Sequence, residues 1–122
     1  KEMDNASSSG EVEKEDGSRL LRNDKRIVFG KFTLDRDLKE LRRGKKPIRI
    51  NAQEYRLLEF FCRHPDRVIG RDELLNEVWG YDTVASTRTV DVHIARLRRK
   101  LGEEQAPRHI HTARGHGYRF SS

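Results

Sequence analysis

The chain has 122 residues, with 26 Lys and Arg against 20 Asp and Glu, and a net charge of +6 at neutral pH. This length suits one domain, and a basic balance favours a polyanionic partner, although many basic proteins have none. No apolar run approaches the roughly 18 residues that cross a membrane. The single cysteine, Cys62, excludes an intramolecular disulfide, so a reducing, cytoplasmic setting is the default expectation.

The first part of the chain is polar and acidic. Residues 1–24 hold seven acidic and four basic side chains, a net charge of −3, so the remainder carries +9. A segment this poor in large apolar groups cannot bury enough surface to offset the entropy of ordering it. We therefore predict a flexible linker or tail over residues 1–24 and a single folded domain over residues 25–122.

Short β-prone runs follow the acidic segment. IVFGKFTLD at residues 27–35 is broken by glycine, and LKELR and PIRI flank a Gly-Lys turn. Short runs bounded by turn residues favour three or four antiparallel strands. Pro47 indicates that the last strand either lies at a sheet edge or starts at this residue.

The hydrophobic period becomes helical in NAQEYRLLEFFCRH, residues 51–64. Asn51 followed by Glu54 has the spacing of a capping box, and the apolar residues cover more than half of the helix, which indicates a largely buried helix. The pair His64-Pro65 ends it, because a residue before proline disfavours helical geometry.

Two further helices and a hairpin complete the domain. We predict helices over residues 71–78 and 88–101, the latter capped by Ser86 or Thr87 and ended by Gly102. IHTARGHGYRF, at the end of the chain, predicts two strands around a glycine-containing turn. Strands, three helices and a hairpin together indicate an α+β domain.

The predicted helix 88–101 has two distinct sides. At 100° per residue, its core stripe contains Val90, Ile94, Leu97 and Leu101. The opposite side contains Arg88, Val92, Ala95, Arg96 and Arg99, flanked by Thr89 and Lys100. A helix fits the major groove of B-form DNA, where arginine pairs with guanine or phosphate and small apolar groups contact thymine methyls. The alternative is a solvated charged face.

Two neighbouring features bear on that choice. Asp91 flanks the core side, where it either accepts from a cytosine amino group or pairs with an arginine of this chain. Arg114 lies in the hairpin turn, and a cationic turn beside a groove-binding helix can reach phosphates or the minor groove. A helix-turn-helix followed by a β-hairpin is a winged helix, which favours the DNA interpretation.

Three runs carry a resemblance to a known family: RDELLNEVWG, STRTVDVHIARLRRKL and HTARGHGYRF. With INAQEYRLLEFFCRHPDRVIGRDELL, they resemble the DNA-binding effector domain of OmpR/PhoB-family bacterial response regulators, over about residues 27–120. The resemblance implies a winged helix-turn-helix with an N-terminal four-stranded antiparallel sheet, three helices and a C-terminal hairpin wing. It also implies sequence-specific binding of double-stranded DNA for transcription regulation.

The resemblance further implies where DNA binds. Helix 88–101 would enter the major groove, and the wing, residues 109–120, would contact the backbone or minor groove. The implied DNA-binding residues are Arg71, Trp79, Arg88, Thr89, Val92, Arg96, Arg99, Thr112, Arg114, Gly115 and Tyr118. For Trp79 we expect core packing to be the main contribution.

Partners also follow from the resemblance. Family members carry an N-terminal receiver domain phosphorylated by a histidine kinase, bind tandem half-sites as homodimers, and contact RNA polymerase through the loop at residues 79–87. This chain departs from the family pattern at four positions: Asn51 for a Thr cap, Gly70 for Ser or Thr, Ala95 for a frequent Arg, and His116 at a variable wing position.

Other chemistry has weaker support. His109 and His111 share a strand face near His116, but no cysteine or carboxylate cluster joins them, and we expect a polar, partly exposed wing edge rather than a metal site. No nucleophile, base and orienting acid occur as a set, so we expect no enzyme, cofactor or metal. A winged-helix protein-interaction module is the main alternative. RNA binding is disfavoured, since the A-form major groove is too narrow for a helix.

Overall fold

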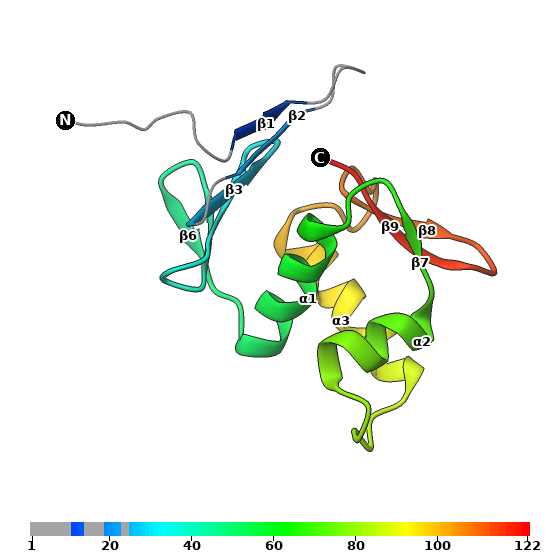
Figure 1. The fold of residues 1–122 in the computed structure, drawn as a ribbon. Helices are drawn as coiled ribbons and strands as arrows, with labels where there is room; N and C mark the ends of the chain where they lie inside the picture. Colours follow the sequence, from blue (N-terminus) through cyan, green and yellow to red (C-terminus); the bar gives the residue numbers. More distant parts are fainter. Residues whose placement is uncertain (1–10, 14–18, 23–24) are drawn as a thin grey trace. The chain divides into compact units, whose positions relative to one another are not determined.

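A computed structural model describes residues 11–13, 19–22 and 25–122. The chain divides into two units, one over residues 1–50 with Ser122 and one over residues 51–121 (Figure 1). Within the described residues, no helix is long and apolar enough to cross a membrane.

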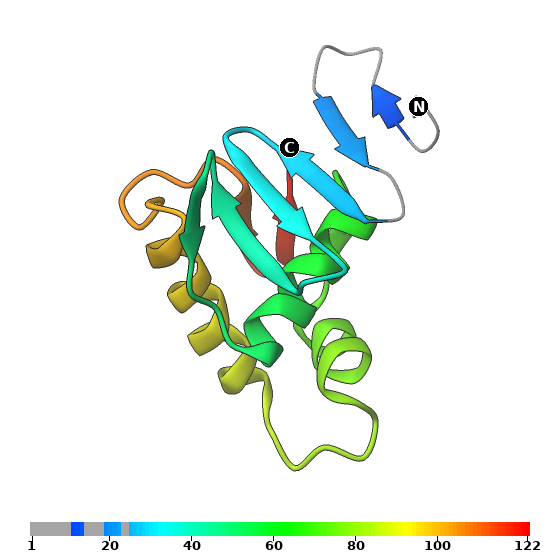
Figure 2. The same ribbon diagram turned by 90° about the vertical axis from the view of Figure 1, so that its left-hand side faces the viewer.

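The first unit contains an antiparallel sheet whose six described strands follow one another in chain order (Figure 2). The strands are β1 (Glu11–Glu13), β2 (Arg19–Arg22), β3 (Arg26–Phe29), β4 (Phe32–Asp35), β5 (Glu40–Arg43) and β6 (Lys46–Ile48). Two-residue turns join β3 to β4 and β5 to β6, and Gly30 and Gly44 supply the positive φ that such hairpin turns need.

One face of this sheet is apolar because alternate strand residues point to the same side. Ile27, Leu34 and Leu41 pair across three neighbouring strands, and all three are fully buried. Phe29 and Phe32 pair in the next row, with ring centroids 5.4 Å apart. These buried side chains form the apolar core of this unit.

Strands β3–β6 confirm the predicted four-stranded sheet, and Pro47 lies in β6 at its edge, as expected. No sequence pattern indicated β1 and β2, which lie within the acidic segment 1–24. The other residues of that segment, 1–10, 14–18 and 23–24, lie outside the described residues, so the linker stays a prediction.

The second unit begins with α1 (Ala52–Arg63), which the predicted capping box starts. The Asn51 side chain accepts from the Glu54 amide at 2.8 Å, and the Glu54 carboxylate accepts from the Asn51 amide at 2.9 Å. The same carboxylate accepts from Lys100 Nζ at 2.6 Å. His64 caps the C-terminal end of α1, as the proline after it requires.

The second helix differs from the prediction in its second half. Residues Arg71–Leu74 form α2, but Leu75–Trp79 continue as η1, a wider π-helical turn. Gln53 of α1 donates its amide to the carbonyl of Val78 in this turn, at 3.1 Å. Gly70 occupies the N-cap position of α2 and, having no side chain, provides no side-chain cap.

The third helix, α3 (Thr87–Lys100), buries Val90, Ile94 and Leu97. Ser86 occupies the cap position without a side-chain hydrogen bond. At the other end Gly102 has φ of 73°. Amides of Gly102 and Glu103 donate back to the last turn at 3.0 and 2.7 Å, which is a Schellman motif. The predicted glycine stop is confirmed.

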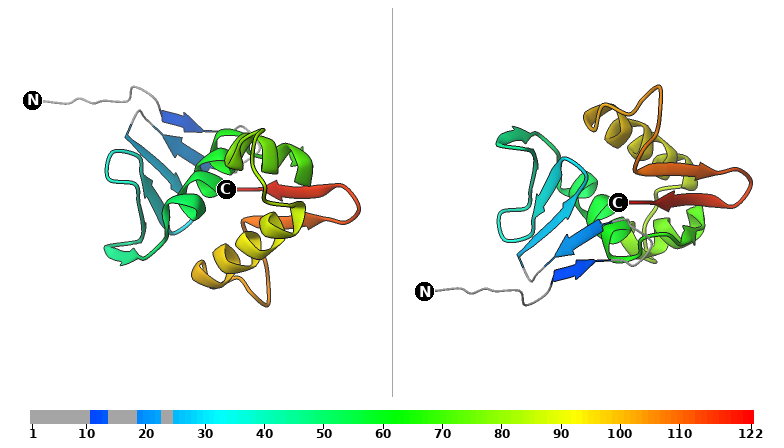
Figure 3. Two further views of the ribbon diagram at one scale, coloured as in Figure 1. Left: turned by 90° about the horizontal axis from the view of Figure 1, so that it is seen from below. Right: turned by 90° about the horizontal axis from the view of Figure 1, so that it is seen from above.

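A three-stranded sheet in the order β7-β9-β8 completes the second unit. Its strands are β7 (Val68–Ile69), β8 (Ile110–Ala113) and β9 (Gly117–Phe120). The hairpin of β8 and β9 confirms the predicted wing, and its turn projects away from the helices (Figure 3). The sequence did not predict β7, which fixes the wing to the segment before α2.

Gly117 makes that attachment sterically possible. Its φ is 137°, and a Cβ there would lie 2.1 Å from the carbonyl oxygen of Ile69. Any other residue would force β7 and β9 apart.

Candidate nucleic-acid interface

The outward side of α3 has the composition predicted from the sequence. Val90 and Leu97 are fully buried, whereas Val92 is 42% exposed. The side chains that share the outward side with Val92 are exposed as well: Arg88, Ala95, Arg96 and Arg99. The two-sided helix is confirmed, with the apolar side chains of Val92 and Ala95 exposed among three arginines.

The arginines of the outward side differ in their contacts. Within the part of the chain that the structure describes, the side chains of Arg88 and Arg96 make no hydrogen bond or ion pair. Arg99 donates to Glu104 at 3.1 Å, but its side chain stays 66% exposed. All three guanidinium groups can therefore reach an external partner.

Arg98 instead turns towards the wing. It donates to the Ile110 carbonyl at 3.0 Å and to the Thr112 hydroxyl at 2.8 Å, and its guanidinium lies 5.6 Å from the Tyr118 ring centroid. This arginine joins α3 to both strands of the hairpin. The sequence indicated no role for it, since its contacts are 12 or more residues away.

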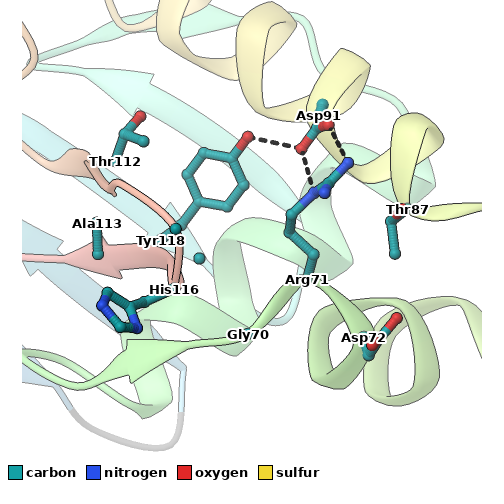
Figure 4. Close-up of a pocket in the computed structure, with 11 residues that line it drawn as sticks. Gly70, Arg71, Asp72, Thr87, Asp91, Thr112, Ala113, His116 and Tyr118 are labelled. Carbon is teal, nitrogen blue, oxygen red and sulfur yellow. Dashed lines mark hydrogen bonds and ion pairs between the residues drawn. The ribbon is translucent and has the colours of Figure 1, made fainter.

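Asp91 connects three elements of the interface (Figure 4). Its carboxylate accepts from Arg71 Nε and Nη2, at 3.1 and 2.6 Å, and from the Tyr118 hydroxyl at 2.7 Å. We call these three residues the Asp91 junction. Of the two roles that the sequence left open for Asp91, the structure shows the intramolecular pair.

Within the Asp91 junction, the surroundings favour an ionised carboxylate at Asp91 and a protonated hydroxyl at Tyr118. Partial burial opposes ionisation of Asp91, but hydrogen bonds from Tyr118 and Arg71 outweigh it and lower its pKa. Burial and the hydrogen bond to Asp91 raise the pKa of Tyr118 to about 12. The Tyr118 hydroxyl therefore keeps its proton at neutral pH and donates it in the hydrogen bond to Asp91.

A groove of about 630 Å³ opens beside the Asp91 junction. The first residues of α2 and α3 form one wall, and the wing forms the other, with Thr87 and His116 at opposite sides (Figure 4). His116 is exposed there, so the structure gives this variable position a place on the groove wall.

The wing turn is exposed and cationic. Arg114 and Gly115 occupy its tip, Gly115 has φ of 79°, and the His116 amide closes the turn on the Ala113 carbonyl at 2.8 Å. The Arg114 side chain forms no hydrogen bond or ion pair with any described residue. It is thus available to an external anion.

Trp79 packs within the second unit, as expected. Its ring meets His93 edge-on, with centroids 5.0 Å apart at 84°, and His93 Nδ1 donates to the Thr89 carbonyl at 2.9 Å. Trp79 and Thr89 are both half-buried. Packing against His93 holds Trp79 in place, and part of the Trp79 and Thr89 side chains stays accessible.

The wing histidines have structural partners. His109 is only 7% exposed and donates from Nδ1 to the Ser121 carbonyl at 2.8 Å, so the expectation of a partly exposed edge was wrong for this residue. His111 Nε2 donates to the Arg108 carbonyl at 2.9 Å. Over the described residues, no group of three metal-binding side chains comes together.

These elements define a class of protein. A three-helix unit whose third helix presents a basic outward side, beside a β-hairpin that projects from the helices, is a winged helix. The sequence matches the family described as "Transcriptional regulatory protein, C terminal" over residues 44–120. The chain belongs to this family and is an effector domain of the OmpR/PhoB type.

Particular relatives agree with this assignment. The Escherichia coli phosphate regulon transcriptional regulatory protein PhoB is 44% identical over 91 residues, 75% of this chain and 40% of that protein. The DNA-binding domain of Klebsiella pneumoniae RstA, solved in complex with the RstA box, matches with TM-score 0.72 and 32% identity, covering 80% of this chain and 97% of that one. Thermotoga maritima DrrB, an OmpR/PhoB homologue, matches with TM-score 0.73 and 28% identity, over 80% of this chain and 44% of that one. The chain thus spans about 40% of the length of its curated relative.

Proposed function

We propose that this chain binds double-stranded DNA sequence-specifically to regulate transcription, as the effector domain of a bacterial two-component response regulator. Residues 88–101 would lie in the major groove, and wing residues 109–120 on the backbone or minor groove. The observation that carries the proposal is the exposed Val92 between Arg88 and Arg96. In the major groove, base edges present thymine methyl groups and hydrogen-bond acceptors. An aliphatic side chain between two arginines therefore suits contact with base edges better than exposure to bulk water.

The proposed contacts divide by role. Arg88, Val92 and Arg96 face outward and would meet base edges, with Thr89 at their margin. Residues that would position the duplex through its phosphates are Arg71, Trp79, Arg99, Thr112, Arg114 and Gly115.

The Asp91 junction sets how two further residues take part. Arg71 uses its Nε and Nη2 on Asp91, which leaves the Nη1 amino group for a phosphate oxygen. Tyr118 has one proton, and Asp91 accepts it. Tyr118 would therefore support the wing beside the duplex and accept, rather than donate, any hydrogen bond.

Selection of bound duplexes from a random pool tests the proposal. We expect one sequence to be enriched, and the full chain to bind that selected duplex much more tightly than a scrambled duplex of equal length. The logarithm of affinity should fall steeply with the logarithm of salt concentration. Absence of enrichment together with a flat salt dependence would favour a protein-interaction module instead.

Partners beyond DNA are part of the same proposal. Tyr81 is 74% exposed and Val84 is fully exposed in the loop 79–87, which suits a protein contact, and we assign it to RNA polymerase. A homodimer would produce two half-sites in the selected sequence, about 34–36 Å apart, one helical turn of DNA. The greater length of the curated relatives supports a receiver domain in the whole protein, acting in the cytoplasm.

A further inference from the structure

Most of the positive charge of the described domain lies outside the unit that contains the proposed reading surface. Residues 51–122 carry twelve basic and ten acidic side chains, a net charge of +2, although they contain both α3 and the wing. Residues 25–50 carry ten basic and three acidic side chains, a net charge of +7. Most of the domain's positive charge therefore has no role in the contacts proposed above.

Within the six-stranded sheet, one end has its charges paired. Lys25 lies 4.0 Å from Asp37, and Arg26 lies 3.7 Å from Asp35. All three acidic side chains of residues 25–50 occur between positions 35 and 40, at or near this end.

At the other end of strands β3 to β6, the charged side chains of the β3–β4 and β5–β6 turns are all cationic. The two turns lie side by side because the Gly44 amide donates to the Lys31 carbonyl at 3.1 Å. On the outer strands β1 and β2, the pair Glu13 and Arg19 lies at this same end. Four exposed side chains define this cationic sheet end: Lys31, Arg43, Lys45 and Lys46. None of these four side chains forms a hydrogen bond or ion pair with a described residue, and Arg43 lies 6.0 Å from the Phe32 ring centroid.

The arrangement is one that an anion would stabilise. Arg43 and Lys46 are direct cross-strand partners, and like charges opposite each other destabilise a sheet. No Asp or Glu occurs in residues 25–34 or 41–53 to offset them. A chain of phosphates held close to these side chains would remove the repulsion and release counterions.

We propose that the cationic sheet end is a second DNA contact that binds backbone phosphates without reading bases. This inference rests on the proposed function, because it extends the footprint of the same domain on the same class of partner. A protein partner fits less well, since protein interfaces have an apolar centre. None of the large apolar side chains exposed in the described structure belongs to this end.

Charge removal at the two ends of the sheet gives a matched test. The variant Lys45→Gln/Lys46→Gln removes two charges from the cationic sheet end, and Lys25→Gln/Lys39→Gln removes two from the opposite end. Full-length chains are titrated against the selected duplex and a scrambled duplex, each with long flanks, over a series of salt concentrations. Circular dichroism checks that both variants keep the wild-type fold.

We expect Lys45→Gln/Lys46→Gln to lower the slope of log affinity against log salt by about 0.9 for each phosphate that the variant no longer neutralises. Affinity should fall about five- to ten-fold per phosphate at roughly 0.1 M salt. The selected and scrambled duplexes should be weakened by the same factor, and the control variant should be affected less.

Two results would overturn the inference. One is a salt slope for Lys45→Gln/Lys46→Gln that equals the wild-type slope on both duplexes. The cationic sheet end would then bind a protein or the acidic segment 1–24 instead of DNA. The other is a weakening confined to the selected duplex, which would make these lysines base readers. Failure of the proposed function is a separate outcome: the wild-type chain itself would fail to distinguish selected from scrambled DNA.

Discussion

The hydrogen bond between Tyr118 and Asp91 joins the wing to α3, and removing it should weaken the packing of the wing against this helix. Asp91→Asn removes the carboxylate charge while keeping the shape of the side chain, and Tyr118→Phe removes only the hydroxyl. The 2.7 Å hydrogen bond has a charged acceptor, and such bonds contribute about 1.5–3 kcal/mol when well buried. The Asp91 side chain is 36% exposed, so solvent screening reduces this to about 1 kcal/mol.

A double-mutant cycle measures that interaction. The free energy of unfolding is determined by urea titration for the wild type, both single variants and the double variant. We expect a coupling energy of about 1 kcal/mol between the two positions. Asp72→Asn is a control, because it removes a carboxylate from the same groove without a hydrogen bond to Tyr118. Effects of Asp91→Asn and Tyr118→Phe that add within about 0.3–0.5 kcal/mol would refute the reasoning.

Three further predictions concern the wing and the helix cap. Gly117→Ala should destabilise the chain by about 2–4 kcal/mol, because its Cβ would lie 2.1 Å from the Ile69 carbonyl; an equal destabilisation in Gly115→Ala, which meets open space, would contradict this. Arg114→Ala should leave the urea midpoint unchanged and lower DNA affinity, with a salt slope reduced by about 0.9, and an unchanged DNA titration would remove the wing from the interface. Burial opposes ionisation of Glu54, but hydrogen bonds from Lys100 and Asn51 outweigh it and hold its pKa below 4.5. Stability from this group is therefore complete above pH 4.5 and is lost as pH falls through the folded-state value, so Glu54→Gln should show a flatter acid dependence; parallel pH–stability curves would exclude that role.

Local sequence patterns predicted the elements that depend on neighbouring residues. The Asn51 capping box, the stop at Gly102 and the two sides of α3 all follow from residues within one or two helical turns. The exposure of Val92 follows from the same periodicity. Such features need no knowledge of the rest of the chain.

Features built from distant residues could not be predicted in this way. The Asp91 junction joins positions 20 and 27 residues apart, and nothing near Asp91 favours Arg71 or Tyr118 as its partner. Strand β7 has two residues, too few for an alternating pattern. It forms because its backbone pairs with β9, about 50 positions further along the chain. The π-helical turn likewise has no hydrophobic period of its own.

Charge segregation in the sheet is visible in the sequence, but its geometry is not. The run RRGKK occupies residues 42–46. Its proximity to Lys31 depends on the pairing of β4 with β5, which places two turns at one end of the sheet. Composition alone shows that the domain is basic. The strand register shows that Lys31, Arg43, Lys45 and Lys46 come together at one place in the sheet.

The central claim is that the outward side of α3 reads bases, and Arg96→Ala tests it most directly. Arg56→Ala is the matched control, because Arg56 is an exposed arginine of α1 with no contact proposed. Affinities for the selected and scrambled duplexes are measured at one salt concentration. Arg96→Ala should cost about 1–3 kcal/mol on the selected duplex and much less on the scrambled one, whereas Arg56→Ala should change neither appreciably. Equal effects on both duplexes would show that Arg96 holds the backbone and would contradict base reading by this helix.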